Sequence, residues 1–118
     1  MALILVADDD VEQVAVQREL LGAMGYEVRT ALSPAETLVE LAHRQPDLIV
    51  VDLRFPLASD GLGLIRGIRD TGFRLPLIVL SGWPDDLYGS PEELLVSRIV
   101  VKGSVHELLQ TITELLES

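Results

Sequence analysis

Four short apolar runs recur along this chain, and each ends directly before a polar or charged residue. They occupy residues 3–7, 48–51, 77–80 and 99–101. Continuous apolar runs of this length are typical of strands that are buried on both faces of a parallel sheet. Parallel strands need long crossover connections, which are usually helices. The spacing of the runs therefore predicts a chain in which strands and helices alternate.

Helical periodicity fills most of the intervals between the runs. Apolar residues recur every three or four positions in residues 11–24, 35–42, 62–70 and 105–116, which predicts four helices with one face toward a core. Residues 26–30 alternate in polarity, as in an outer strand. The residues expected to face the core are Val11, Val14, Ala15, Leu21 and Met24; Ala35, Leu38, Val39 and Ala42; Leu62, Ile65 and Ile68; and Val105, Leu108, Leu109, Ile112, Leu115 and Leu116.

Two segments do not fit this periodicity. Residues 54–61 are expected to form a loop. In residues 82–97, proline and glycine at Pro84, Gly89 and Pro91 argue against a long helix, and only a short one, from Pro91 to about residue 96, is expected. The whole pattern predicts one α/β domain over residues 1–118. Its doubly wound, flavodoxin-like sheet has five parallel strands in the order 2-1-3-4-5, with a shortened or irregular fourth helix.

The composition excludes several classes of protein. The formal net charge of -10 argues against direct nucleic-acid binding and against binding to anionic membranes, because phosphate contacts need a basic face. There is no cysteine, so thiol catalysis and zinc–thiolate sites are excluded. No apolar stretch has the roughly 18–20 residues of a transmembrane helix, and the first residues lack the basic region of a signal peptide. A cytoplasmic protein is the simplest expectation.

The polar residues that follow the apolar runs are the candidate functional residues. Three aspartates, Asp8 to Asp10, follow the first run, and Asp52 follows the second. Ser81 follows the third, and Lys102, the only lysine, follows the last. Because the carboxyl ends of parallel strands lie on one edge of a sheet, these groups should converge. Carboxylates with a hydroxyl and a compact cation suit a divalent metal ion and a phosphoryl group.

Each of these residues also has an ordinary structural explanation. Asp10 stands where an N-cap is expected, and Asp52 and Ser81 could be simple turn residues. Three consecutive aspartates exceed what a cap requires, however, and together with Asp52 they would repel one another unless a cation neutralised them. The use of eight arginines and one lysine suggests that Lys102 has a specific role as a point charge.

Together these residues resemble the receiver domain of two-component response regulators. The resemblance extends over the whole chain and rests on the following motifs: the acidic pair Asp8-Asp9, the strand-end Asp52 with Pro56 four residues later, Asp60-Gly61, Ser81-Gly82 and Lys102. It implies a phosphorelay switch in which Asp52 is the phosphoacceptor and Ser81 and Lys102 contact the phosphoryl group. It also implies a Mg²⁺ site formed by Asp9, Asp52 and the backbone carbonyl of Arg54, with Asp8 acting through metal-bound water.

The resemblance implies partners as well. A sensor histidine kinase or a phosphotransfer protein would supply the phosphoryl group, and a downstream protein or an output domain would receive the signal; a homodimer is left open. The protein would not be an enzyme in the usual sense, because it catalyses only its own phosphorylation and dephosphorylation.

Some positions depart from the family pattern. Gly103 stands where a proline is usual, Ile99 replaces the switch aromatic, and the segment of the fourth helix is interrupted. These departures leave open a pseudo-receiver, which would act as a phosphorylation-independent protein-interaction module. A small Mg²⁺-dependent phosphotransferase or phosphatase that works through an aspartyl phosphate is a third hypothesis, but 118 residues leave no room for a substrate-binding cap.

Overall fold

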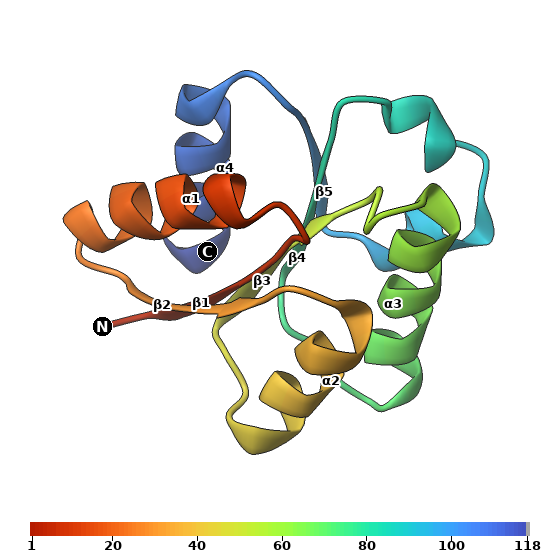
Figure 1. The fold of residues 1–118 in the computed structure, drawn as a ribbon, viewed down its shortest axis with the longest axis horizontal. Helices are drawn as coiled ribbons and strands as arrows, with labels where there is room; N and C mark the ends of the chain where they lie inside the picture. The colour runs from red at the N-terminus through yellow and green to blue at the C-terminus, as the bar shows by residue number, and fades with distance from the viewer. Residues whose placement is uncertain (118) are drawn as a thin grey trace.

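A single parallel sheet forms the centre of the computed structural model, which describes residues 1–117. The strands lie in the order β2-β1-β3-β4-β5, so the predicted order is confirmed. Figure 1 shows the strands running between two pairs of helices. The strands are β1 (Leu3–Ala7), β2 (Glu27–Ala31), β3 (Leu48–Asp52), β4 (Leu77–Ser81) and β5 (Arg98–Val101), and the helices are α1 (Val11–Ala23), α2 (Pro34–His43), α3 (Ala58–Asp70) and α4 (Val105–Glu117).

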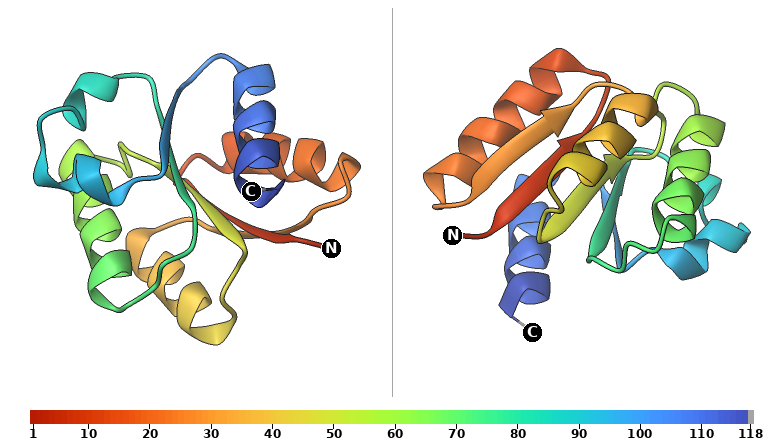
Figure 2. Two further views of the ribbon diagram at one scale, coloured as in Figure 1. Left: turned by 180° about the vertical axis from the view of Figure 1, so that it is seen from behind. Right: turned by 90° about the horizontal axis from the view of Figure 1, so that it is seen from below.

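The three central strands are buried throughout, which explains their continuous apolar sequences. Alternate side chains of each strand enter two separate cores. Leu5, Ile49 and Leu77 pack under α2 and α3, whereas Ile4 and Ile78 pack under α1 and α4. The two views of Figure 2 show the same division of the helices between the two faces. No helix within residues 1–117 is long and apolar enough to cross a membrane.

The predicted irregularity after β4 is confirmed. The chain there forms two short 3₁₀ turns, η1 (Pro84–Asp86) and η2 (Pro91–Leu95), in place of a long helix. Both turns begin at a proline, whose fixed φ suits the first helical position and whose missing N–H would interrupt a longer helix. Leu87, between the turns, is fully buried and holds the segment to the core under α3.

Three of the predicted helix faces were partly wrong. In α1, Val14 and Leu21 are buried, but Val11, Ala15 and Met24 are exposed and Gln17 is buried instead. The predicted face was too broad, because α1 carries apolar residues on several sides.

In α2 the core face is centred on Thr37 and Leu41, while Ala35, Val39 and Ala42 are exposed and Leu38 only borders the core. The hydroxyl of Thr37 donates to the carbonyl of Ser33 at 2.8 Å, which satisfies its polar group and allows it to be buried. In α4, Leu108 and Ile112 are buried as predicted and Leu109, Leu115 and Leu116 border the core, but Val105 is exposed.

The start of α3 was also predicted too late in the sequence. Instead of a loop that continues through Gly61, the helix begins at Ala58. The carboxylate of Asp60 accepts a hydrogen bond from the backbone N–H of Leu57 at 3.0 Å and thereby caps the first turn. A Cβ atom at Gly61 would overlap the carbonyl oxygen of Leu53, whereas at Gly63 it would meet nothing within 4 Å. Glycine at 61 therefore lets α3 begin directly against the chain that leaves β3.

We expect Gly61→Ala to lower the free energy of unfolding by about 3 kcal/mol or more, because backbone atoms of Leu53 would have to move. The matched variant Gly63→Ala should raise it by about 0.5–1 kcal/mol, as expected for an open site inside a helix. Urea unfolding followed by circular dichroism measures both. Equal effects of the two substitutions would contradict the close approach of α3 to Leu53.

Candidate metal and phosphoryl site

The carboxyl edge of the sheet brings together the polar residues that follow the strands. Asp8 directly follows β1, Asp52 ends β3, Ser81 ends β4 and Lys102 directly follows β5. In the ladders Ala7 lies opposite Val51, and Asp52 lies opposite Leu80, so the strand ends are level with one another. The predicted convergence is therefore present in the structure.

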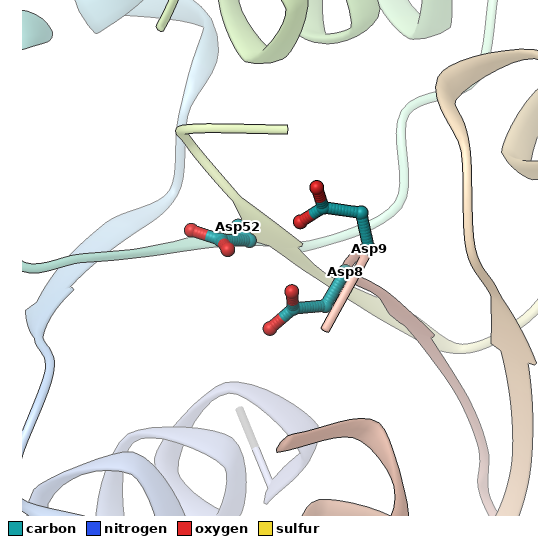
Figure 3. A group of neighbouring side chains, drawn as sticks. All are labelled: Asp8, Asp9 and Asp52. Carbon is teal, nitrogen blue, oxygen red and sulfur yellow. The ribbon is translucent and has the colours of Figure 1, made fainter. Parts of the chain in front are cut away.

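Three carboxylates form the acidic part of this edge. Asp8, Asp9 and Asp52 each place one carboxylate oxygen within 4.8 Å of the others. Figure 3 shows the carboxyl groups of Asp8 and Asp9 pointing to the side on which Asp52 lies. Asp8 and Asp52 are buried, while Asp9 is exposed to solvent. An acidic cluster with one open side suits a cation that keeps some of its water.

The carboxyl group of Asp8 is only half satisfied by the protein. Its Oδ1 accepts a hydrogen bond from the backbone N–H of Asp10 at 2.9 Å, but its Oδ2 is buried without a partner among residues 1–117. Burial, followed by the negative charge of Asp52, raises the pKa of Asp8 to about 7. A buried acceptor of this kind needs either a proton or a cation.

Asp10 belongs to α1 and not to the cluster. Its Oδ1 accepts from the backbone N–H groups of Glu12 and Gln13, at 3.0 and 3.3 Å. It is therefore the N-cap that its position before Val11 predicted. Three consecutive aspartates thus divide into two cluster members and one helix cap.

Lys102 supplies the positive charge of the site. Its Nζ donates to Oδ2 of Asp52 at 3.0 Å, and it retains about a third of its side-chain exposure. The backbone N–H of Lys102 also donates to the carbonyl of Ser81 at 2.9 Å, which fixes the start of the following loop. At the next residue φ is +105°, a conformation that Gly103 adopts readily and that proline cannot adopt. The family's usual proline is therefore incompatible with this loop.

Ser81 is buried beside these groups. Its Oγ accepts a hydrogen bond from the backbone N–H of Trp83 at 3.0 Å, which orients the hydroxyl at the end of β4. An accepting hydroxyl still has a proton to donate, and a phosphoryl oxygen is a suitable acceptor. Ser81 thus has the position and the hydrogen-bonding capacity that the sequence predicted.

Arg54 has contacts that the sequence did not reveal. Its Nε donates to Oδ2 of Asp86 at 2.8 Å, and its guanidinium lies over the ring of Trp83, 5.5 Å from the ring centroid. These contacts tie the chain after Asp52 to η1. The pairing depends on the 3₁₀ turn at residues 84–86, whose geometry no sequence pattern specified. The expected role of the Arg54 carbonyl as a metal ligand stays a prediction.

The donor set at this edge fits a magnesium ion. It consists of carboxylate oxygens, which are the hard ligands that Mg²⁺ prefers. On the buried side of the cluster, the unpaired Oδ2 of Asp8 would be stabilised by a cation. Within residues 1–117, Lys102 is the only cation in contact with these three carboxylates.

Comparisons with known proteins agree with this geometry. Residues 4–113 match the family model of the response regulator receiver domain. Over 78 residues, or 66% of this chain, the sequence is 40% identical to response regulator MprA of Mycobacterium sp. (strain KMS) and 36% identical to transcriptional regulatory protein PrrA of Mycobacterium tuberculosis. These alignments span 34% and 33% of the two curated relatives, which are thus about three times longer than the matched segment.

Solved structures show the same fold. Response regulator TrrA from Thermotoga maritima, in complex with Mg(2+)-BeF, superposes with a TM-score of 0.88 at 27% identity, covering 98% of this chain and 100% of that one. NtrX from Brucella abortus superposes with a TM-score of 0.87 at 26% identity, covering 98% of this chain and 27% of NtrX.

The raised pKa of Asp8 makes stability depend on pH in a defined direction. The folded chain keeps this proton up to about pH 7, whereas its ordinary pKa is 3.8, so the free energy of unfolding falls as pH rises between these values. The amide that replaces this carboxyl group in Asp8→Asn has no proton to lose. In Mg²⁺-free buffer, we expect this variant to exceed the parent in stability by about 1–3 kcal/mol at pH 8 and to lose that advantage near pH 4.

Urea unfolding at both pH values measures this difference. Asp9→Asn is the matched control, because the Asp9 carboxylate is exposed, and it should change stability much less. An advantage of Asp8→Asn that is the same at pH 4 and pH 8 would show that the Asp8 charge is not strained in the folded chain.

Proposed function

The chain belongs to the response regulator receiver domain family, and we propose that it is a phosphorylatable signalling switch that accepts a phosphoryl group on Asp52. The donor would be a phosphohistidine of a sensor kinase or of a phosphotransfer protein. The observation that carries the proposal is the 3.0 Å contact between Lys102 and Asp52 at the edge of an acidic cluster. A carboxylate with its own cation is the arrangement that an aspartyl phosphate requires.

In the proposed reaction, a carboxylate oxygen of Asp52 attacks the phosphorus of the donor. An oxygen–phosphorus bond forms, the phosphorus–nitrogen bond to the donor histidine breaks, and the electron pair stays on the histidine nitrogen. Lys102 Nζ is placed to compensate the charge that the phosphoryl oxygens bring, and the hydroxyl of Ser81 can donate to one of them. Mg²⁺ bound by the carboxylates would supply the remaining positive charge.

A pseudo-receiver is the second candidate, because the segment between β4 and β5 consists of two 3₁₀ turns and Ile99 replaces the usual aromatic. The complete set of Asp8, Asp9, Asp52, Ser81 and Lys102 disfavours it. The two candidates differ in whether Asp52 can be modified, which is a direct measurement.

We expect acetyl phosphate with Mg²⁺ to add one phosphoryl group to the protein, and Asp52→Asn to abolish this addition. Intact-protein mass spectrometry measures the added mass. Asp85→Asn, which alters an exposed aspartate near the same edge, is the control and should be modified like the parent. A parent protein that stays unmodified with Mg²⁺ would favour the pseudo-receiver.

The contacts of Arg54 support a proposed route for the signal. Phosphorylation at Asp52 would place anionic oxygens two residues before Arg54, where they compete with Asp86 for its guanidinium. Release of Asp86 would free η1 to move, in a segment that is held by short turns and by the buried Leu87. The output of the switch would therefore be a rearrangement of residues 82–97 that a downstream protein or an output domain recognises.

This route predicts the effect of removing the guanidinium. With beryllofluoride as a phosphoryl mimic, the amide chemical shifts of residues 85–88 should change in the parent and should change by less than half as much in Arg54→Ala. Arg66→Ala is the matched control, because Arg66 binds Glu92 at 3.1 Å and links α3 to η2 without contacting the acidic cluster. If Arg54→Ala responds like the parent, the signal does not pass through the Arg54–Asp86 contact.

A further inference from the structure

A cavity at the edge of the sheet opposite to the acidic cluster is lined by two arginines. It lies between the chain that leaves α3 and the chain that enters β5, and its volume is about 400 Å³. Residues 72–74 form one wall and residues 94–97 form the other, with Arg69 between them. Figure 2 shows the segment that contains η2 beside α3 in both views. None of the residues that line this cavity belongs to the proposed phosphoryl site.

The guanidinium of Arg69 is held in place by backbone carbonyls. Its Nη1 donates to the carbonyls of Phe73 and Leu75 at 3.1 and 2.8 Å, and its Nε donates to the carbonyl of Leu95 at 2.9 Å. Phe73 and Leu95 belong to opposite walls, so the guanidinium lies between the two walls of the cavity. A guanidinium that is already oriented loses less conformational entropy on binding a ligand than a mobile side chain does.

One nitrogen of this guanidinium remains free to bind a ligand. Nη2 of Arg69 makes no hydrogen bond within residues 1–117, and it is not one of the buried polar atoms without a partner. This nitrogen is therefore open to solvent. Its two N–H groups can donate to the oxygens of an anion, which is the ligand that a guanidinium binds most strongly.

The positive charge at this cavity is not neutralised by the protein. The three partners of Arg69 are uncharged carbonyls, and the exposed Arg74 forms no ion pair in the described part of the chain. Burial, followed by the charge of Arg74, lowers the pKa of Arg69, so the two cations are close enough to repel each other. Four other arginines each contact a carboxylate, namely Arg29, Arg44, Arg54 and Arg66.

An anion with two negative charges matches this pair of arginines. The phosphate of a monoester carries a charge of about -1.5 to -2 at pH 7 and offers three acceptor oxygens, so it can contact Arg69 and Arg74 together. A carboxylate has a single charge and would leave one of the two cations without a counter-charge. Phe73 and Leu94 add apolar surface at the same cavity, and Leu94 is 90% exposed. An apolar group on the ligand would cover part of that surface.

We propose that the cavity between residues 72–74 and 94–97 binds the phosphate group of a small phosphate monoester. Nη2 of Arg69 donates to the phosphate, Arg74 contacts it from its exposed position, and the apolar part of the ligand packs on Phe73 and Leu94. The site shares no residue with the acidic cluster, and the proposal therefore does not depend on phosphorylation of Asp52.

Phenyl phosphate is the probe for this site, and benzyl alcohol is its uncharged counterpart. In titrations of the intact protein without Mg²⁺, phenyl phosphate should cause saturable changes in the amide chemical shifts of residues 69–75 and 94–97. The Nε–H resonance of Arg69 should follow the same titration curve, which a purely structural arginine would not do. Inorganic phosphate should bind more weakly, because it lacks the apolar group. Raising NaCl from about 20 mM to about 200 mM should weaken phenyl phosphate by about threefold or more.

Arg74→Gln should weaken phenyl phosphate by about threefold to tenfold, because it removes one of the two charges. This variant should fold like the parent, since Arg74 is exposed and makes no side-chain hydrogen bond within residues 1–117. Arg18→Gln is the matched control. It removes the charge of an exposed arginine of α1 outside the cavity, and it should leave binding unchanged.

The absence of saturable changes at residues 69–75 and 94–97 would overturn the proposal. Equal binding of phenyl phosphate and benzyl alcohol would also overturn it, because the phosphate would then contribute nothing. Equal weakening by Arg74→Gln and Arg18→Gln would show that phenyl phosphate responds only to the overall charge of the protein, and this result would exclude a site at the two arginines.

Discussion

The carboxyl edge of this sheet is organised around an electrostatic conflict. Asp8 and Asp52 are both buried at the ends of adjacent strands, and Asp9 lies beside them. Among residues 1–117, Lys102 carries the only positive charge in contact with these carboxylates. Water cannot screen charges that lie in the protein interior as it does at the surface. Burial of the apolar strands thus holds the carboxylates close to one another. The free energy gained by burying the strands offsets the repulsion between the carboxylates.

The way in which the repulsion between the carboxylates is neutralised determines what the site can bind. The buried, unpaired Oδ2 of Asp8 attracts either a proton or a cation, and the proposed phosphoryl group on Asp52 would bring further negative charge. Both requirements point to a divalent metal ion in addition to Lys102. Family membership, the fold shared with TrrA and the orphaned Oδ2 of Asp8 are therefore three observations that agree on one chemistry.

Much of this arrangement could be predicted from the sequence, because parallel strands end on one edge whatever their exact boundaries. The positions of Asp8, Asp52, Ser81 and Lys102 depend only on that rule. The faces of α1 and α2 were less predictable. Gln17 and Thr37 occupy core positions although they are polar, and α1 has apolar residues on several sides, so periodicity did not select one face.

The contact of Arg54 with Asp86 could not be predicted, for a related reason. It joins residues 32 positions apart through a 3₁₀ turn, and local sequence determines neither the turn nor the side-chain directions around it. The start of α3 was predicted wrongly for a similar reason. Asp60-Gly61 is typical of a turn in the sequence, and only the structure shows that the backbone of Leu53 lies against Gly61.

The single lysine has a chemical consequence. Lys102 carries the only side-chain amine of the protein, and about a third of its side chain is open to solvent. Acetylation, or any other acylation, removes the positive charge of the lysine it modifies. In most proteins such a reaction is spread over many surface lysines, whereas here it has one side-chain target, the residue that holds Asp52. Acylation of the side-chain amine of this chain would therefore remove the positive charge that contacts Asp52.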